Sequence, residues 1–332
     1  MPVLTIEEAQ RLVARTLTRC RTSIDNAQSV ARALVAAEAD GLRGHGLSRV
    51  PSYAAQAKVG KVDGFAIPGT MRPRPALFAV DAANGFAYPA LDAATVALPD
   101  IVRSEGIAAA AIRRSHHCGA AGHPVERLAE AGLVALMFAN TPAAMAPWGG
   151  SAGLFGTNPI AFACPLARRP PLVVDLSLSK VARGNILALK QKGEPIPEGW
   201  ALDAAGRPTT DPEAALQGTM LPAGDAKGTA LALMVELLAA GLTGANFAAE
   251  AASFLDAEGG PPGTGQLIVA FDPAPFCGDA AVARFTQLAA QIEAQAPARL
   301  PGARRHAARR QAVVVGLSVS DALLAEIAEV SA

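Results

Sequence analysis

A histidine lies between two glycines in the segment Arg43–Arg49, whose sequence is RGHGLSR. Because glycine has no side chain, the imidazole of His45 can approach a ligand closely. An imidazole with an ordinary pKa of about 6.5 can give or take a proton at neutral pH. Arg49, four residues further on, can bind a carboxylate through two parallel hydrogen bonds. The pattern predicts acid–base chemistry on a small carboxylated molecule, although in isolation it also fits a surface loop whose side chains contact only water.

A second histidine-rich segment, SHHCGAAGH at 115–123, follows the apolar run Ile107–Ile112. A strand that leads through small residues into a helix exposes backbone N–H groups that can bind an anion. The segment therefore suits a nucleotide phosphate or a nicotinamide, with packing against a second copy of the chain as the alternative. We expect no metal site, because adjacent strand residues point to opposite faces and no carboxylate is near in the sequence.

Turns and strand ends offer further polar groups. Thr157 and Asn158 lie in the stretch FGTNPI, where they offer hydrogen-bonding groups at a turn, a composition that ordinary β-turns share. The segment 175–179 follows the buried run Leu172–Val174, and Asn185 comes soon after it. Sites in α/β proteins usually lie at strand ends, although helix caps have the same composition.

Two segments carry cations beside a turn. Lys227 lies in LPAGDAKG at 221–228, which opens a long helix whose free N–H groups suit a phosphate, although the GxxxxGK[ST] motif is absent. The segment RLPGARR at 299–305 combines a tight turn with Arg304 and Arg305, a pair that could neutralise the 2′-phosphate that distinguishes NADP from NAD. With Arg309 and Arg310 it forms the basic cluster of the chain, whose default interpretation is a solvated face.

The composition narrows the class of protein. Of the 332 residues 51 % are hydrophobic and 17 % are charged, and Lys plus Arg equal Asp plus Glu at 29 each. We therefore expect a large core and no net field that favours nucleic acid or a membrane. The four cysteines form no CxxC pair, which is typical of reduced thiols. No signal peptide or spanning apolar run is visible, so we expect a cytoplasmic protein.

Periodicity and helix breakers predict the elements that position these groups. Helices are expected at 5–19, 25–40, 48–58, 89–104, 121–132, 227–241, 279–296 and 319–330. Strands are expected at 76–80, 107–112, 133–138, 172–174 and 265–271. The proline-rich stretch 190–223 should be an ordered excursion, because Trp200 and Leu202 give it apolar groups to bury.

The ends of the chain are thus helical and the centre is mixed. The predicted fold class is α/β, with a large mixed or antiparallel sheet domain at 71–289 that binds the cofactor. A discontinuous helical domain, made of 1–70 plus 290–332, would wrap it. No GxGxxG lies between a strand and a helix, so a dinucleotide would be bound without a Rossmann turn.

Taken in order, five segments resemble the malate/L-lactate dehydrogenase superfamily over residues 3–330. They are RGHGLSRVPSY at 43–53, SHHCGAAGH at 115–123, FGTNPIAFACP at 155–165, LPAGDAKGTALALMVELL at 221–238 and RLPGARR at 299–305. The stretches SKVARGNI, GEPIPEGWALD, GRPTTDP and GTMLPAGDAKG are most similar to the Δ1-piperideine-2-carboxylate/Δ1-pyrroline-2-carboxylate reductase branch. The resemblance implies a homodimer that reduces cyclic ketimine acids to L-pipecolate or L-proline with NADPH, NADH being the alternative cofactor.

Carried over residue by residue, the resemblance makes His45 the proton donor, Arg49 the anchor of the substrate carboxylate and Thr157 a second substrate contact. Some relatives have a proton relay of a serine and an aspartate, at positions where this chain has Gly44 and the expected catalytic residue Asn185. The proton route would then involve water or Asp175. The cofactor would contact residues of four segments: His117, Cys118, Gly119, Ala120, Ala121, Asp175, Leu176, Ser177, Asp225, Arg299, Gly302, Arg304 and Arg305.

Two other functions fit the same residues. The same histidine and arginine would serve a 2-oxo acid, as in malate, lactate or sulfolactate dehydrogenases and diketogulonate reductases. A binding or structural protein of the same fold, without activity, is the third alternative. In every case the expected ligand is a small molecule, with no nucleic acid or membrane as partner.

Overall fold

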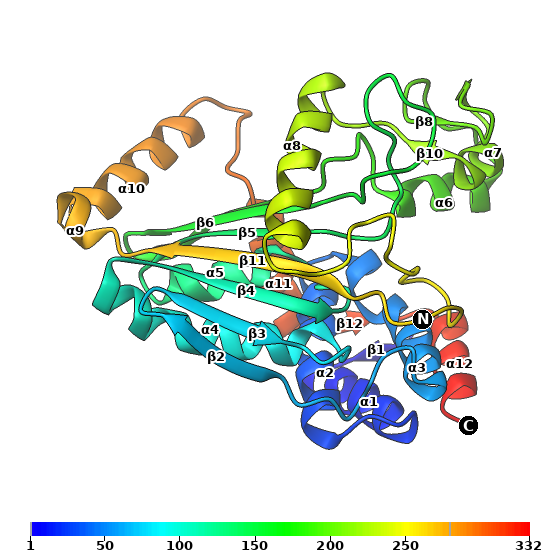
Figure 1. Cartoon of the computed structure of the whole chain (residues 1–332), viewed down its shortest axis with the longest axis horizontal. Helices are drawn as coiled ribbons and strands as arrows, with labels where there is room; N and C mark the ends of the chain where they lie inside the picture. The colour runs from blue at the N-terminus through cyan, green and yellow to red at the C-terminus, as the bar shows by residue number, and fades with distance from the viewer. Residues whose placement is uncertain (1, 279) are drawn as a thin grey trace.

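A seven-stranded sheet with the order β2-β3-β4-β11-β5-β6-β7 forms the centre of the chain (Figure 1). The computed structural model describes residues 2–278 and 280–332, so the first residues of the predicted domain 1–70 and of the predicted helix 279–296 lie outside it. Its strands are β2 (Gly69–Arg74), β3 (Leu77–Asp81), β4 (Ile107–Ser115), β5 (Val134–Ala139), β6 (Ile160–Leu166), β7 (Arg169–Leu176) and β11 (Thr264–Phe271). Only β3 and β4 pair in parallel, which confirms a mixed, largely antiparallel sheet.

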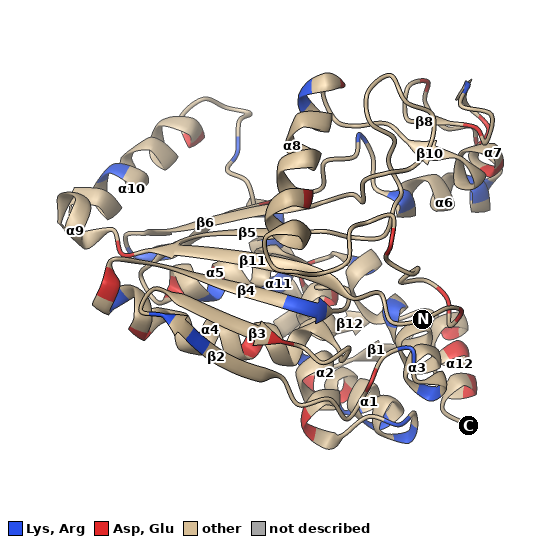
Figure 2. Ribbon diagram, viewed as in Figure 1, with Lys and Arg blue, Asp and Glu red and all other residues tan. Residues whose placement is uncertain are grey.

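Helices cover both faces of this sheet (Figure 1). Alternate residues of β4 and β5 are buried, as expected where a strand packs one face on helices, here α4 (Ala87–Glu105) and α5 (Gly122–Glu130). On the other face lie α8 (Ala226–Glu236), which continues into the π-helical turn Leu237–Gly241, and α10 (Ala280–Glu293). Charged residues are absent from β5, β6 and β11 and concentrate on the surrounding helices and loops (Figure 2). The core of the chain is therefore this sheet and its helical layers.

The strand directions bring several connecting segments together at one end of the strands. β3, β4, β5 and β7 run one way, and β2, β6 and β11 run the other way. The chain therefore leaves β4, β5 and β7 at the same edge at which it enters β6 and β11. We call this end of the strands, at which β4, β5 and β7 finish, the C-terminal edge. It carries residues 116–122, 140–141, 157–159 and 177–179.

The two ends of the chain pack together beside this edge (Figure 1). α1 (Ile6–Arg19), α2 (Ile24–Ala39) and α3 (Val50–Val59) come from the start, and α11 (Ala303–Val315) and α12 (Asp321–Val330) come from the end. α12 packs on α1 and α3, α11 packs on α2, and β1 (Val3–Leu4) pairs with β12 (Leu317–Ser318). Thr5 and Glu8 form the capping box that begins α1, and Ser23 caps α2.

The proline-rich excursion forms a small lobe of its own. It holds α6 (Arg183–Lys192), α7 (Pro212–Gln217) and a three-stranded sheet of β8 (Ala201–Leu202), β9 (Pro208–Thr209) and β10 (Thr219–Met220). Trp200 packs against its apolar core and Leu202 is buried, which confirms the prediction of an ordered segment. The short helix α9 (Ala274–Cys277) precedes α10. Within the described residues, no helix combines the length and apolarity that a bilayer crossing needs.

Candidate active site

The loop that carries His45 consists of two short 3-10 turns between α2 and α3, Arg43–His45 and Leu47–Arg49. Glu38, on α2, holds the loop because its carboxylate accepts a hydrogen bond of 2.9 Å from the N–H of Leu47. A Cβ atom at Gly46 would lie 2.2 Å from the same carboxylate, so only glycine fits there. At Gly44 a Cβ would meet nothing within 4 Å, so the backbone just before His45 borders open space.

His45 packs against a second imidazole and leaves one nitrogen unpaired. Its ring stacks on that of His117, with centroids 5.2 Å apart and planes inclined by 21°. Burial, together with the positive charge of Arg49, lowers the pKa of His45 to about 4, so the ring is neutral at pH 7. Its Nδ1 is buried and has no hydrogen-bond partner among the described residues. A buried unpaired nitrogen is uncommon in a folded protein and suits a polar atom of a ligand.

A chain of two tyrosine hydroxyls fixes the orientation of the His117 ring. Its Nδ1 lies 2.6 Å from the hydroxyl of Tyr53, which lies 3.3 Å from the hydroxyl of Tyr88. Burial raises the pKa of Tyr53 to about 12, so this phenol keeps its proton. Burial also holds the pKa of His117 well below its usual value. A protonated Tyr53 that donates to Nδ1 leaves the ring proton of His117 on Nε2.

Sequence reasoning missed an aromatic residue that closes this cluster. Phe254 belongs to the irregular segment that follows α8, and its ring centroid lies 5.1 Å from that of His116 and 5.2 Å from that of His117. Gln56 on α3 anchors the segment by donating to the carbonyl of Phe254 at 2.9 Å, and its other amide atom lies 2.9 Å from Nε2 of His116. No local pattern marks Phe254, because it contacts residues about 140 positions away.

Arg49 keeps part of its guanidinium available. Its Nε donates to the carbonyl of Gly44 at 2.7 Å, and no carboxylate of the described residues forms an ion pair with it. Its charge is near enough to lower the pKa of His45, His116 and His117. The arrangement suits an external carboxylate, whose negative charge would offset this effect.

The two residues predicted at the FGTNPI turn have different surroundings. Thr157 is half-buried at the C-terminal edge, where its N–H donates to Oγ1 of Thr141 at 2.9 Å. Asn158 is fully buried, and its amide donates to Glu236 at 2.7 Å and to the carbonyl of Ala232 at 3.1 Å. Asn158 therefore holds α8 on the sheet and offers no group to a ligand.

The start of α5, where the sequence predicts a bound nucleotide phosphate, instead binds a carboxylate of the protein itself. The N–H of Gly122 donates to the Asp175 carboxylate at 2.8 Å, so a side chain occupies the position expected for a nucleotide phosphate. Burial raises the pKa of Asp175. Residues 117–121 are all buried, and a Cβ at Gly119 would lie 2.6 Å from the hydroxyl of Tyr88. The segment after β4 thus packs against Tyr88 on α4 and, at Gly122, against Asp175 near the end of β7.

The predicted pair of 2′-phosphate ligands separates in the structure. The Arg305 side chain is buried and forms ion pairs with Glu126 at 3.0 Å, Asp40 at 3.3 Å and Asp175 at 3.9 Å. The prediction for Arg305 is therefore wrong, because three carboxylates already surround its guanidinium. Arg299 and Arg304 are exposed. Gly302, at the start of α11, has a φ of +79° and lies against the backbone of Val173.

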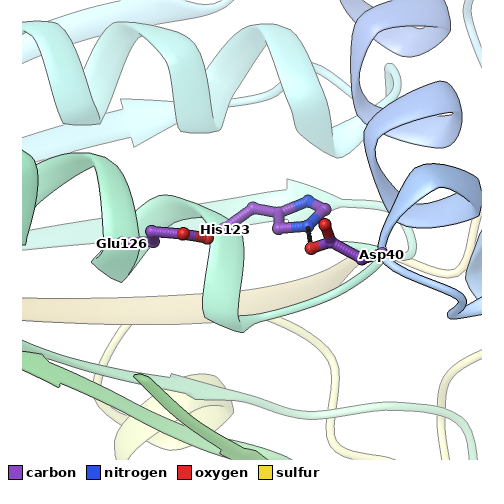
Figure 3. Close-up of side chains that lie close together, drawn as sticks. All are labelled: Asp40, His123 and Glu126. Carbon is purple, nitrogen blue, oxygen red and sulfur yellow. Dashed lines mark hydrogen bonds and ion pairs between the residues drawn. The ribbon is translucent and has the colours of Figure 1, made fainter. Parts of the chain in front are cut away.

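The basic cluster is also only partly a solvated face. Arg304 and Arg310 are exposed, whereas Arg309 is half-buried and forms ion pairs with Asp40 and Glu126. His123 lies 2.9 Å from Asp40 (Figure 3), which corrects the expectation that no carboxylate is near the histidine-rich segment. Asp40, His123 and Glu126 have the spacing of a metal site. Both carboxylates are, however, taken by the guanidinium groups of Arg305 and Arg309.

Two predicted residues are exposed, on elements that carry none of the histidine cluster. Asn185 is exposed on α6 in the small lobe, and no described side chain that contacts His45 belongs to that helix. Asp225 is exposed at the start of α8 with a φ of +57°. The turn before it reaches the C-terminal edge through two backbone hydrogen bonds of 2.8 Å, from Ala223 to Leu178 and from Leu178 to Thr157. The roles of Asn185 and Asp225 stay predictions.

Comparisons with known proteins identify the family and agree with this fold. Residues 4–328 match the malate/L-lactate dehydrogenase family. The chain is 52 % identical to the (2R)-3-sulfolactate dehydrogenase (NADP(+)) of Chromohalobacter salexigens, over 93 % of this chain and 92 % of that protein. It is 41 % identical to the Δ1-pyrroline-2-carboxylate/Δ1-piperideine-2-carboxylate reductase of Pseudomonas syringae pv. tomato, over 93 % and 91 %. The crystal structure of Δ1-piperideine-2-carboxylate reductase from that organism superposes with a TM-score of 0.94 at 39 % identity, covering 99 % of this chain and 100 % of that one.

Proposed function

Because the chain belongs to the malate/L-lactate dehydrogenase family, we propose that it is an NADPH-dependent oxidoreductase that acts at C2 of a small carboxylic acid. Cyclic ketimine acids, Δ1-pyrroline-2-carboxylate and Δ1-piperideine-2-carboxylate, are the first candidate substrates. The observation that carries the proposal is the unpaired, buried Nδ1 of His45 beside a guanidinium that has no carboxylate partner among the described residues. Relatives with the reductase name support this substrate class.

Arg49 and His45 divide the work on the substrate. Arg49 binds the carboxylate and Thr157 assists, which fixes C2 and its nitrogen or oxygen next to His45. Burial is the main cause of the low pKa of His45, and the charge of Arg49 is the second. The bound carboxylate offsets this charge and so raises the pKa of the ring, which favours protonation of the group that delivers the proton. Positioning of this kind can contribute roughly 7–11 kcal/mol, and a proton donor adds about 10²–10⁴-fold.

The residues of the C-terminal edge suit a nicotinamide nucleotide. The bound cofactor supplies the hydride that reduces C2. Residues 118–121 lie beside His117 without bulky side chains, and Gly302 lies against Val173 of β7, with the exposed Arg299 and Arg304 on either side of it in the sequence. Arg304 is the remaining candidate of the arginine pair for a 2′-phosphate. Asp175 accepts the Gly122 N–H and keeps these segments adjacent.

A second candidate substrate is favoured by specific observations. The relative at 52 % identity is named for (2R)-3-sulfolactate, a 2-hydroxy acid. The chain also has Gly44, and an exposed Asn185, at the two positions of the ketimine reductase relay. A neutral His45 suits a base that accepts the hydroxyl proton during oxidation of such a substrate.

Steady-state kinetics with both substrate classes test the proposal. NADPH oxidation is measured with Δ1-pyrroline-2-carboxylate, 3-sulfopyruvate, pyruvate and oxaloacetate at equal concentrations. A kcat/KM at least 100-fold higher for the ketimine than for any 2-oxo acid supports the first candidate, and the reverse ratio supports the second. Turnover of none of them, with no NADPH binding, would contradict the enzymatic proposal.

We also propose a homodimeric assembly. Exposed apolar residues extend along α8 and into the π-helical turn that follows it, namely Leu231, Leu233, Met234 and Leu237. A second copy of the chain would cover this face. Sedimentation velocity should give a dimer for the native chain and a monomer for Leu237→Arg, and a native monomer at micromolar concentration would contradict the proposal.

A further inference from the structure

One carboxylate lies where the His45 loop leaves α2. Asp40 is the C-cap residue of that helix, and its side chain is fully buried. It accepts hydrogen bonds from Nε and Nη2 of Arg309 at 2.7 and 2.8 Å and from Nε2 of His123 at 2.9 Å. Burial alone would raise the pKa of Asp40, but the bonds from Arg309 and His123 lower it to about 2. The group is therefore an anion at every pH at which the enzyme would work.

Two arginines connect this anion to the C-terminal edge. Arg309 also donates to Glu126 at 2.9 Å, and Arg305 donates to Glu126 at 3.0 Å. Arg305 lies 3.9 Å from Asp175, which accepts the N–H of Gly122 at 2.8 Å. We call Asp40, His123, Glu126, Arg305 and Arg309 the Asp40 network. It forms a continuous path from the start of the His45 loop to the segments at 119–122 and 175.

We propose that Asp40 is a positioning residue that fixes the His45 loop relative to these segments, an inference that rests on the proposed function of His45. The far side of the loop is held by Glu38 at Leu47, whereas its near side begins at Gly41, where α11 packs closely. Between them, Gly44 has no neighbour within 4 Å of its Cβ position. Asp40 thus attaches the near side to α11 and α5 through its side chain, and reacting groups misplaced by about 1 Å can lose about 10²-fold in rate.

A matched pair of variants isolates this role. Asp40→Asn keeps the shape of the side chain and removes its charge. Asp92→Asn is the control, because Asp92 also binds two arginines, Arg32 at 3.3 Å and Arg127 at 2.6 Å, but contacts no part of the loop. Asp40→Asn should raise amide hydrogen exchange across residues 41–49 at least tenfold and lower kcat at least tenfold. Asp92→Asn should change both less than threefold.

Cofactor binding and a double-mutant cycle separate positioning from other roles. NADPH binding, followed by its fluorescence, should change less than threefold in Asp40→Asn, and a tenfold loss would instead make Asp40 part of the cofactor site. In the His45→Ala background, Asp40→Asn should lower kcat by less than threefold further, because Asp40 acts through His45. An equal loss in both backgrounds would overturn the proposal.

Two further outcomes are distinguishable. If His45→Ala retains full turnover, the proposed function fails, whereas a full Asp40→Asn effect in an impaired His45→Ala background overturns only the positioning role. If Asp40→Asn does not fold, His123→Ala replaces it in the same cycle, since it removes one bond to Asp40 from a side chain that is 17 % exposed. Unchanged exchange at 41–49 in His123→Ala would overturn the proposal.

Discussion

Two polar regions of this molecule lie close together but differ in whether their polar groups are paired. In the Asp40 network every buried carboxylate faces a guanidinium and is paired with it. In the histidine cluster of His45, His116 and His117, burial keeps the rings neutral and leaves two ring nitrogens without a partner among the described residues. Paired groups hold a structure together, whereas neutral and unpaired groups remain available to a ligand.

The largest expected effect is on stability in acid. In the unfolded chain histidines bind protons below about pH 6.5, but His45 and His116 do so only near pH 4 and pH 3. The unfolded state therefore gains protons first, and the free energy of unfolding should fall on the order of 5 kcal/mol between pH 7.5 and pH 4.5. Urea denaturation at both pH values measures this, and His116→Gln should reduce the dependence.

The two regions should separate along the same pH scale. The folded pKa of Asp40 lies near 2, below its ordinary value of 3.8, so the stability that Asp40 contributes is lost only below about pH 4. Asp40→Asn should therefore leave the pH dependence between 7.5 and 4.5 unchanged. A flat profile in the native chain would contradict the neutral state of the histidine cluster.

Breaking the network should cost about 3–5 kcal/mol. Arg309→Met removes the cation that Asp40 and Glu126 share, and it leaves two buried carboxylates with fewer partners. Thermal or urea denaturation at pH 7.5 gives the loss. Arg310→Met, on the exposed neighbour, is the control and should change stability by less than about 0.5 kcal/mol.

A smaller loss is expected at the open guanidinium. Arg49→Lys keeps the charge but not the planar pair of donors, and a charge-assisted hydrogen bond contributes about 1.5–3 kcal/mol. KM for the carboxylated substrate should therefore rise about 10–100-fold, with a smaller change in kcat. An unchanged KM would show that another group binds the carboxylate.

The smallest effect concerns cofactor choice. Arg304→Ala should lower the preference for NADPH over NADH about tenfold if the exposed guanidinium contacts the 2′-phosphate. Arg310→Ala serves as the control, because Arg310 is also exposed on α11 and lies six residues after Arg304. The ratio of kcat/KM with the two cofactors decides, and an unchanged ratio would remove Arg304 from the cofactor site.

Features that depend on local sequence could be predicted, whereas those that depend on contacts between distant residues could not. The main strands were predicted within a few residues, because apolar runs bounded by Gly and Pro depend on local sequence, although β2 and β6 were not predicted. The helix α11 was missed, because its start RLPGARR has the composition of a turn and its arginines suggest solvent. The division into domains at 70 and 289 stays a prediction, and its second boundary falls inside α10.

Partners of side chains were the hardest to foresee. Arg305 pairs with Asp40 and Glu126, which lie 265 and 179 positions away in the sequence. An arginine beside a turn suggests a phosphate ligand, but in the folded chain these two distant carboxylates are its partners. Asp175 similarly occupies the N–H of Gly122. The prediction that His45 and Arg49 belong to the site rests on glycines and a spacing of four residues, which are visible locally. Tyr53 lay inside a quoted motif, yet its contact with His117 emerged only in the fold.

The central claim is that the neutral ring of His45 exchanges a proton with the bound substrate. The pH dependence of kcat/KM, which reports the free enzyme, should show an ionisation near pH 4, and that of kcat should show the same group at a higher pH. His45→Gln should lose both ionisations and about 10²–10⁴-fold in kcat at pH 7.5. Near-native turnover of His45→Gln with an unaltered pH profile would contradict the account.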